Sequence, residues 1–201
     1  MTRGAGAGSI RIVAGRWRGR KLAAPADAAI RPTGERQRES LFDILGHGRF
    51  APGGVSMLQG AAVLDVFAGT GALGLEALSR GAATCLFLDS AAPARRLIEA
   101  NAAACKAQAQ ARVVTGDACN PAAAPPAPWT PATLAFFDPP YGQGLAEKAL
   151  AALHAKGWFA NGAVAVVETG EREAFAPPPG WTLEDERRYG KSLFRFLRGT
   201  Q

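Results

Sequence analysis

The 201-residue chain has few of the side chains that bind metal ions. It contains two histidines, His47 and His154, and three cysteines, Cys85, Cys105 and Cys119. The cysteines are odd in number, and neither they nor the histidines have the spacing of a metal site. We therefore expect no metal cofactor and no disulfide framework, but the reduced thiols that are typical of a cytoplasmic protein.

The chain also lacks a long apolar run. No stretch approaches the roughly 20 consecutive apolar residues that span a bilayer, and the N-terminus has no apolar segment typical of a signal peptide. Apolar residues nevertheless make up 48% of the sequence, which is enough for a substantial core. The length then predicts one large domain, or one domain with an extension, without a membrane partner.

Excess charge is confined to one end of the chain. Residues 1–40 contain nine Lys and Arg but three Asp and Glu, whereas the remainder contains 14 residues of each sign. The formal net charge of +6 is therefore located in the first fifth of the sequence. A concentrated basic segment favours a polyanionic partner, above all nucleic acid. A solvated N-terminal arm is the alternative.

The basic residues surround a predicted hairpin. Residues 1–9 are rich in glycine and alanine and are expected to be disordered. Residues 10–14 and 17–23 read as two short strands joined by a tight turn. Trp17 lies among the cations, and it either stacks on an RNA base or packs the hairpin against the domain. The residues predicted to bind RNA are those of the hairpin and one near the start of a helix predicted over 36–45: Arg11, Arg16, Arg18, Arg20, Lys21 and Arg36.

The middle of the chain contains a strand, a glycine-rich turn and a helix. Residues 62–66 form a short, partly β-branched apolar run, and residues 72–79 have apolar side chains at helical spacing. Gly69 and Gly71 lie between them and permit both a positive φ and the close approach of a ligand to the backbone. Together these residues predict the first βα unit of a nucleotide-binding sheet.

Asp65, at the carboxyl end of this strand, discriminates between ligands. The glycines fit the dinucleotide pattern G-x-G-x-x-G, but a carboxylate here would repel a pyrophosphate at the helix N-terminus. It suits a ligand with an ammonium group and no phosphate, and S-adenosylmethionine is such a ligand. The alternative is that Asp65 only caps the following turn or helix. The predicted cofactor-binding residues of this segment are Asp65, Phe67, Ala68, Gly69 and Gly71.

Two further acids follow predicted strands. Asp89 ends the strand predicted over 84–88, near the place where an acid meets the ribose hydroxyls in this class of fold. Asp117 follows the strand predicted over 112–115. There it can accept the adenine amino proton, while the backbone of Ala118 serves a ring nitrogen. A simple turn aspartate is the alternative for Asp117.

A second motif, Asp138-Pro139-Pro140-Tyr141, follows the strand predicted over 133–137. The prolines fix a rigid, extended turn and leave carbonyl acceptors in a fixed geometry. Such acceptors can hold both hydrogens of an exocyclic amine and aim its lone pair at an incoming methyl group. Tyr141 can stack on the base, and Asp138 can accept a hydrogen bond and take up the proton. We predict that all four residues are catalytic, and a Pro-Pro loop with a capping Asp is the alternative.

Four segments carry a resemblance to a known family. VLDVFAGTGALGLEALSRGA and FFDPPYG resemble the class I S-adenosylmethionine-dependent methyltransferases that modify exocyclic amines. RIVAGRWRGRKL and RPTGERQRESLFDIL are similar to a narrower group, the RsmD family of 16S ribosomal RNA guanine-N2 methyltransferases. The resemblance covers roughly residues 10–198. The family usually has Glu where Asp89 stands, and residues 90–93 lack the charges often found after that acid.

The resemblance implies an α/β, Rossmann-like class I methyltransferase fold. Its sheet is seven-stranded and mostly parallel, with an antiparallel C-terminal hairpin over 181–189 and 192–197 and a small N-terminal β-hairpin extension. The chain is then divided into a disordered tail (1–9), a basic RNA-binding extension (10–32) and a methyltransferase domain (33–201).

The implied reaction is transfer of a methyl group from S-adenosylmethionine to guanine N2 in 16S ribosomal RNA. The resemblance implies an assembled small ribosomal subunit as substrate, and we expect a monomeric, cytoplasmic enzyme. Two alternatives stay open. One is an adenine-N6 methyltransferase acting on DNA or RNA, and the other is a non-catalytic RNA-binding assembly factor.

Overall fold

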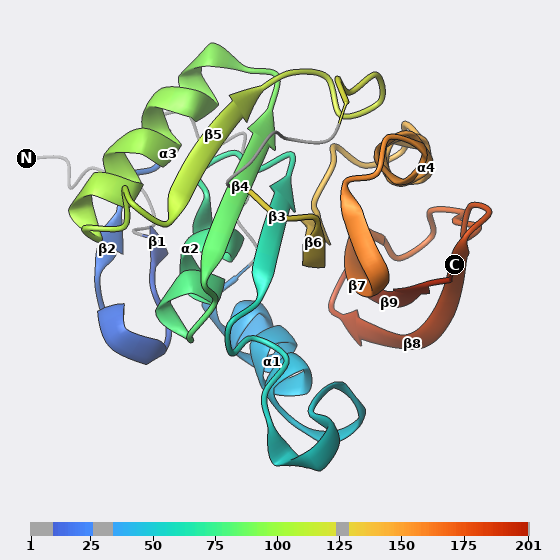
Figure 1. The fold of residues 1–201 in the computed structure, drawn as a ribbon, viewed down its shortest axis with the longest axis horizontal. Coiled ribbons are helices and arrows are strands. Elements are labelled where there is room, and N and C mark those ends of the chain that lie inside the picture. The colour runs from blue at the N-terminus through green and yellow to red at the C-terminus, as the bar shows by residue number, and fades with distance from the viewer. Residues whose placement is uncertain (1–9, 26–33, 124–128, 201) are drawn as a thin grey trace, which may run out of the picture.

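The computed structural model of the protein describes residues 10–25, 34–123 and 129–200. These residues form a seven-stranded sheet covered by helices and a separate two-stranded sheet near the N-terminus (Figure 1). The predicted tail and the last part of the predicted extension lie outside the described residues.

The large sheet has the strand order β5-β4-β3-β6-β7-β9-β8. Strands β5, β4, β3, β6 and β7 are parallel, whereas β9 and β8 are antiparallel to their neighbours. This order confirms the predicted, mostly parallel sheet with its antiparallel C-terminal hairpin. The strands are β3 (Ala62–Val66), β4 (Thr84–Asp89), β5 (Ala111–Thr115), β6 (Ala132–Phe137), β7 (Phe159–Gly170), β8 (Trp181–Tyr189) and β9 (Ser192–Gly199).

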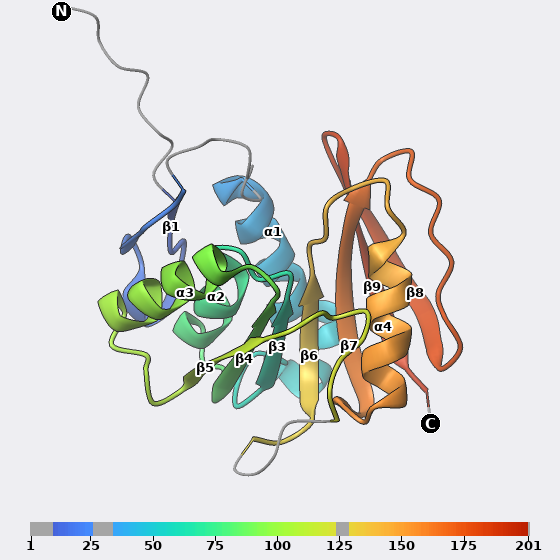
Figure 2. The same ribbon diagram turned by 90° about the horizontal axis from the view of Figure 1, so that it is seen from above.

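The direction in which the chain crosses the sheet reverses at β3. From β3 the chain moves outward through β4 to β5 and then returns to β6 on the other side of β3. Ligands of open α/β sheets bind outside the carboxyl ends of the strands at such a reversal. Figure 2 shows that the loop after β6 and the turn between β8 and β9 project from the same edge of the sheet. The fold therefore places the candidate site at this edge.

Helices cover both faces of the sheet. Helices α1, α2 and α3 pack on one face and α4 packs on the other (Figure 2). Successive residues of β3 enter the two layers, since Val63 packs in the first and Leu64 in the second. Strands that are covered on both faces read as continuous apolar runs. The described helices are α1 (Glu35–Gly46), α2 (Ala72–Ser79), α3 (Ala92–Ala104) and α4 (Leu145–Ala155), with the 3₁₀ helices η1 (Gly15–Trp17), η2 (Gly48–Phe50) and η3 (Pro52–Gly54).

Several elements have the bounds expected from the sequence. The strand over 62–66, the helix over 72–79 and the strand over 181–189 are confirmed residue for residue. The helix predicted over 36–45 is one residue longer at each end, because α1 runs over Glu35–Gly46. Local periodicity thus identified the elements better than their ends.

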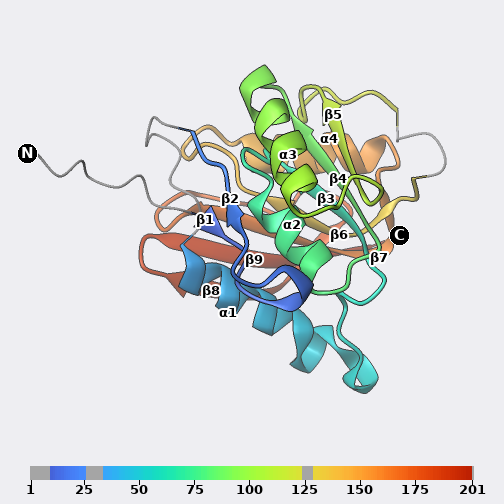
Figure 3. The same ribbon diagram turned by 90° about the vertical axis from the view of Figure 1, so that its left-hand side faces the viewer.

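The N-terminal extension forms the second sheet, but its strands are shorter than predicted. Strand β1 (Ile10–Arg11) pairs antiparallel with β2 (Lys21–Leu22), where the sequence predicted strands over 10–14 and 17–23. The connection contains η1 in place of a tight turn. Figure 3 shows the small sheet beside α2.

Side chains of α2 explain why these strands are short. Glu76, which is fully buried, accepts hydrogen bonds from the backbone N–H groups of Val13 and Ala14 at 2.7 and 2.9 Å. The Ser79 Oγ accepts the N–H of Trp17 at 3.0 Å. These N–H groups donate hydrogen bonds to side chains of α2, and therefore they do not pair with the opposite strand of the hairpin. The extension is anchored to the domain by polar side chains that the sequence pattern did not single out.

Candidate active site at the strand ends

The chain between β3 and α2 makes a sharp turn at the tip of β3. Phe67 has a φ of 59°, and Gly69 and Gly71 have φ values of 54° and 74°. A positive φ at a residue other than glycine is uncommon, and such strain clusters at ligand-binding sites. The N–H of Phe67 donates to the carbonyl of Leu88 at 3.0 Å, which fastens the turn to β4. The predicted turn residues are therefore held together beside the tip of β4.

The three glycines of the motif have different surroundings. A Cβ on Gly69 would meet only the carbonyl oxygen of Phe67, at 3.9 Å, so this face of the turn is open. A Cβ on Gly71 would lie 3.2 Å from the ring of Phe87, and one on Gly74 would lie 2.4 Å from the same ring. Gly71 and Gly74 are thus needed for close packing of the helix on the sheet, whereas Gly69 leaves room for a ligand.

Asp65 is buried beside this turn, with an exposed fraction of 2%. Its Oδ2 accepts a hydrogen bond from the N–H of Gly74 at 2.9 Å. Burial raises the pKa of Asp65 to about 8, the neighbouring Asp89 also raises it, and the bond from Gly74 opposes the shift. The carboxylate therefore caps α2, which is the arrangement that the sequence left open as the alternative.

Asp89 ends β4 next to the glycine turn. Its Oδ2 accepts the N–H of Gly69 at 2.9 Å, and its Oδ1 accepts the N–H of Ala91 at 2.8 Å. The carboxylate thus lies beside the open face of Gly69. The ribose contact predicted for Asp89 would use the remaining lone pairs of the same oxygens.

Asp117 and Ala118 follow β5 in a turn that contacts Asp89. The N–H of Gly116 donates to the backbone carbonyl of Asp89 at 3.2 Å, which brings this turn to the edge that holds the glycine turn. Asp117 is exposed, and its Oδ1 accepts the N–H of Cys119 at 2.8 Å, as a turn aspartate does. Ala118 is buried in the layer beneath α4. Both residues predicted to contact adenine are therefore near the tip of β4.

The Asp-Pro-Pro-Tyr turn lies at the tip of β6, the other neighbour of β3. The N–H of Asp138 donates to the carbonyl of Val66 at 3.5 Å, which links the two strand tips. Pro139 is buried, whereas Pro140 is exposed. The two motifs that the sequence marked as functional are thus adjacent in the structure.

Tyr141 projects from this turn with 47% of its surface exposed. Its hydroxyl donates to Glu168 Oε1 at 2.7 Å and lies 3.1 Å from Ser192 Oγ. Burial of the hydroxyl end, together with the Glu168 contact, raises the pKa of Tyr141, so the phenol is protonated at neutral pH. The ring is fixed at its hydroxyl end and still accessible over much of its surface, as stacking on a base requires.

Sequence reasoning missed Glu168 and Ser192. Glu168 is a buried carboxylate near the end of the apolar strand β7, and the same signal identified Asp65 and Asp89. It could therefore have been found. Ser192 is paired with Gly170 only through the antiparallel contact of β9 with β7, and no local pattern reveals that pairing.

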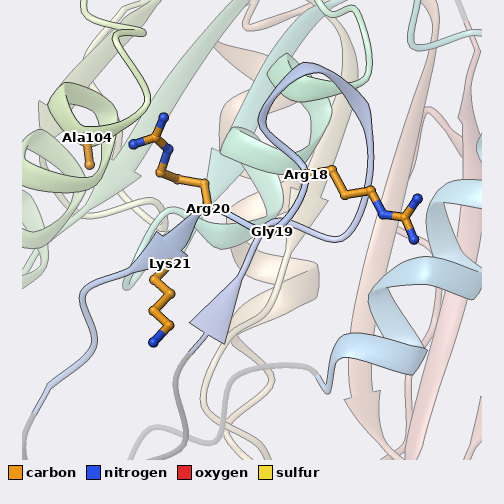
Figure 4. A pocket seen from close by; sticks show the side chains of 5 residues that line it. All are labelled: Arg18, Gly19, Arg20, Lys21 and Ala104. Atoms are coloured by element: carbon orange, nitrogen blue, oxygen red, sulfur yellow. The ribbon is translucent and has the colours of Figure 1, made fainter.

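The predicted RNA-binding cations are spread over the extension and the start of α1. Arg36 is exposed in the first turn of α1. Figure 4 shows Arg20 directed toward Ala104 and Arg18 directed away from it. An open cavity of about 550 Å³ has a wall with three cationic side chains, and it is lined by Arg18, Gly19, Arg20, Lys21 and Ala104 (Figure 4).

Two other predicted cations have partners within the protein. Arg11 forms an ion pair with Glu35 at 3.2 Å. Arg16 donates to Gln110 Oε1 at 2.6 Å, and its guanidinium lies 4.1 Å from the centre of the Trp17 ring. Trp17 itself is half-buried against the core, which agrees with the packing interpretation of this residue. The cations of the open cavity are therefore the better candidates for a phosphate contact.

The described residues offer neither a metal site nor a membrane-spanning helix. No group of three or more His, Cys, Asp or Glu side chains among them could hold a metal ion. No helix in the described part of the chain is long and apolar enough to cross a membrane.

Known protein sequences match almost the whole chain. Residues 10–198 match the family described as "Conserved hypothetical protein 95". Ribosomal RNA small subunit methyltransferase D of Escherichia coli K12 is 40% identical over 195 residues, which cover 96% of this chain and 91% of that protein. The protein of the same name from Haemophilus influenzae is 32% identical over 191 residues and covers 95% of this chain and 94% of its own length.

Solved structures share the fold. A methyltransferase-like protein from Escherichia coli matches with a TM-score of 0.78 and 35% identity, over 96% of this chain and 99% of that one. A methylase-like protein from Haemophilus influenzae matches with a TM-score of 0.74 and 30% identity, over 96% and 100% of the two chains. The sheet order, the two adjacent motifs and these matches agree: the chain belongs to the RsmD family of methyltransferases.

Proposed function

We propose that this chain transfers a methyl group from S-adenosylmethionine to the exocyclic N2 of a guanine in 16S ribosomal RNA. The observation that carries the proposal is the meeting of two motifs at adjacent strand tips. A glycine turn with one open face ends β3, and an Asp-Pro-Pro-Tyr turn with an accessible aromatic ring ends β6. Two relatives named as small-subunit ribosomal RNA methyltransferases support RNA as the substrate. Guanine N2 follows from the resemblance of the N-terminal segments to the RsmD family.

The tips of β3 and β4 fit S-adenosylmethionine. The open face of Gly69 allows a ligand to lie against the backbone, and an ammonium group of the ligand would favour the ionised form of the buried Asp65 carboxyl. Asp89 would accept hydrogen bonds from the ribose hydroxyls. Asp117 would accept one from the adenine amino group, and the backbone N–H of Ala118 would donate to a ring nitrogen of the adenine. When bound, S-adenosylmethionine supplies an electrophilic methyl group on a sulfonium. The residues assigned to this site are Asp65, Phe67, Ala68, Gly69, Gly71, Asp89, Asp117 and Ala118.

The turn at the tip of β6 would hold the base. The carbonyl groups of Asp138, Pro139 and Pro140 accept the amine hydrogens, so that the nitrogen lone pair points at the methyl group. Tyr141 stacks on the base, and its bond to Glu168 fixes the ring. Asp138 takes up the proton that the amine loses after it gains the methyl group. These residues act by positioning and by electrostatic stabilisation.

The N-terminal extension would bind the RNA backbone. Arg18, Arg20 and Lys21 line an open cavity of about 550 Å³ that would receive phosphates. Arg11, Arg16 and Arg36 extend this basic surface, and the first two would exchange their present partners for phosphate. We expect the enzyme to act as a monomer in the cytoplasm on an assembled small subunit.

Transfer of a labelled methyl group to small ribosomal subunits, followed by nucleoside analysis, tests the proposal. N2-methylguanosine is the expected product, and the Asp138→Asn variant supplies the background. N6-methyladenine would identify an adenine methyltransferase instead. The absence of transfer to subunits, naked 16S ribosomal RNA and DNA would favour a non-catalytic assembly factor.

A further inference from the structure

Asn101 is a buried amide on α3 that bonds to two distant segments. Its exposed fraction is 1%, and Ile98 and Ala102 beside it belong to the apolar core. Its Oδ1 accepts the N–H of Ala23 at 2.7 Å, and its Nδ2 donates to the carbonyl of Ala23 at 3.0 Å. The same Nδ2 donates to the carbonyl of Thr70 at 2.9 Å. Both N–H bonds of the amide are therefore used.

The two segments that Asn101 joins belong to different parts of the proposed site. Thr70 lies between Gly69 and Gly71 in the glycine turn and is itself buried. Ala23 directly follows β2, the strand that carries Lys21. One side chain thus links the exit of the basic extension to the turn that is proposed to hold the cofactor. The amide is buried, and both of its N–H groups donate hydrogen bonds. A movement of Ala23 relative to Thr70 would therefore break at least one of these bonds, and the buried amide is out of reach of the solvent that could replace it.

Other polar side chains anchor the extension without such a link. The Ser79 Oγ accepts the N–H of Trp17 at 3.0 Å and donates to the carbonyl of Ala14 at 2.6 Å. Its two partners both lie in the extension. Ser79 therefore offers a matched control, in which the extension loses an anchor and the hydrogen bond to Thr70 is kept.

We propose that Asn101 is a positioning residue that couples RNA binding on the extension to cofactor binding at the glycine turn. RNA held by Arg18, Arg20 and Lys21 fixes the extension, and thereby Ala23. Asn101 then holds the Thr70 carbonyl in the conformation that opens Gly69 to the cofactor. By thermodynamic reciprocity, the cofactor also tightens RNA binding by the same factor. This inference rests on the proposed function, since it needs both ligands.

The coupling factor is measured directly on the full chain. The dissociation constant of labelled S-adenosylhomocysteine, which carries no methyl group to transfer, is determined with and without saturating small ribosomal subunits. Allosteric couplings are typically about 5- to 150-fold, and we expect the subunits to tighten wild-type binding at least about 5-fold. Asn101→Ala should reduce this ratio to about 1. Ser79→Ala should keep the ratio while it weakens subunit binding.

Asn101→Asp sharpens the test, because Asp keeps an acceptor for the N–H of Ala23 and loses the donors to the carbonyls of Thr70 and Ala23. We expect it to lose the coupling and to raise the KM for S-adenosylmethionine, with kcat at saturating substrates changed less than about twofold. A merely structural role would lower thermal stability and reduce kcat as well. The wild-type ratio in folded Asn101→Ala or Asn101→Asp protein would overturn the proposal.

The unaltered chain provides a measurement that does not depend on any variant folding. Hydrogen exchange of the backbone amides over residues 69–75 should slow when small ribosomal subunits bind in the absence of cofactor. Unchanged exchange there, or a wild-type ratio of 1, would overturn the coupling. If the same enzyme still forms N2-methylguanosine, the proposed function stands, whereas a failure of the proposed function appears as the absence of methyl transfer.

Discussion

The large sheet and the N-terminal extension are stabilised in different ways. In the sheet, Val63 and Leu64 of β3 are buried in opposite apolar layers, and close packing of this kind allows few alternative arrangements. The extension packs Ile10, Ile12 and Leu22 into the same core. In addition, the residues next to its two-residue strands bond to the polar side chains of Glu76, Ser79 and Asn101. The sheet therefore fixes the geometry of the candidate site, while the extension presents its charge on a small sheet that polar side chains help to hold in place. Changes at the strand tips should alter turnover, and changes on the extension should alter RNA affinity.

The largest effect is expected at the tip of β6. Asp138→Asn removes the proposed proton acceptor and should lower kcat by about 100-fold or more. The dissociation constant for S-adenosylmethionine should change less than about twofold, because the glycine turn is intact. Rapid-quench assays and calorimetry measure the two quantities. Equal loss of turnover and cofactor binding would remove the role given to Asp138.

Removal of the positive charges that line the cavity of the extension should change RNA affinity without changing the strand tips. The triple change Arg18→Gln, Arg20→Gln and Lys21→Gln should weaken subunit binding by roughly 10- to 100-fold near physiological salt, because about three phosphate contacts are lost. The slope of log affinity against log salt should become shallower by about 2. A titration over 50 to 200 mM salt measures both.

Lys156→Gln, at the exposed residue that follows α4, is the control for removal of a positive charge outside the extension. It should leave the affinity and the salt slope unaltered. Equal binding by the triple variant and the wild type would show that the basic extension is incidental.

Packing of the glycine turn is tested by Gly74→Ala. The new Cβ would lie 2.4 Å from the Phe87 ring and 2.5 Å from Cys85 Sγ, and overpacking of this kind costs about 1–3 kcal/mol. Urea denaturation should show a corresponding drop in the free energy of unfolding. Gly46→Ala at the end of α1 is the control, since its Cβ would meet only Ser56 Oγ at 3.7 Å. Similar stabilities of the two variants would contradict the close packing of α2 on β4.

A pH dependence of stability is expected from Asp65. The folded-state pKa of about 8 lies above the unfolded value of about 3.9, so the folded protein binds more protons between these pH values. The free energy of unfolding should therefore fall as the pH rises through this window, by at most about 1.4 kcal/mol per pH unit. Asp65→Asn removes the titration and keeps an acceptor for Gly74. Parallel stability curves for the two proteins would show that Asp65 does not titrate in this range.

The central βα unit could be predicted from the sequence because its signals are local. An apolar run, glycines and a helical period determine β3, the turn and α2, and the order of the neighbouring strands follows from a known fold. The ends of the hairpin strands could not be predicted, since Val13 and Ala14 bond to Glu76 far along the chain. The burial of Arg38 could not be predicted either, because nothing in the local sequence indicates that its side chain donates to the carbonyl of Arg11.

The candidate site shows the same division. Residues at strand tips, such as Asp89 and Asp138, were identified because a polar residue that ends an apolar run is conspicuous. The partners of Asp65 and Tyr141 depend on tertiary contacts, with Gly74 and Glu168 respectively. The sequence therefore predicted which motifs meet at the strand tips, but it missed Glu168 and Ser192 and did not predict how each side chain is held.

The most direct test of the central claim is a crystal structure of the protein with S-adenosylhomocysteine. We predict that its amino-acid part lies against Gly69, that its ribose contacts Asp89, and that its sulfur faces the turn formed by residues 138–141. A ligand bound at another place, or with its sulfur directed away from that turn, would contradict the account.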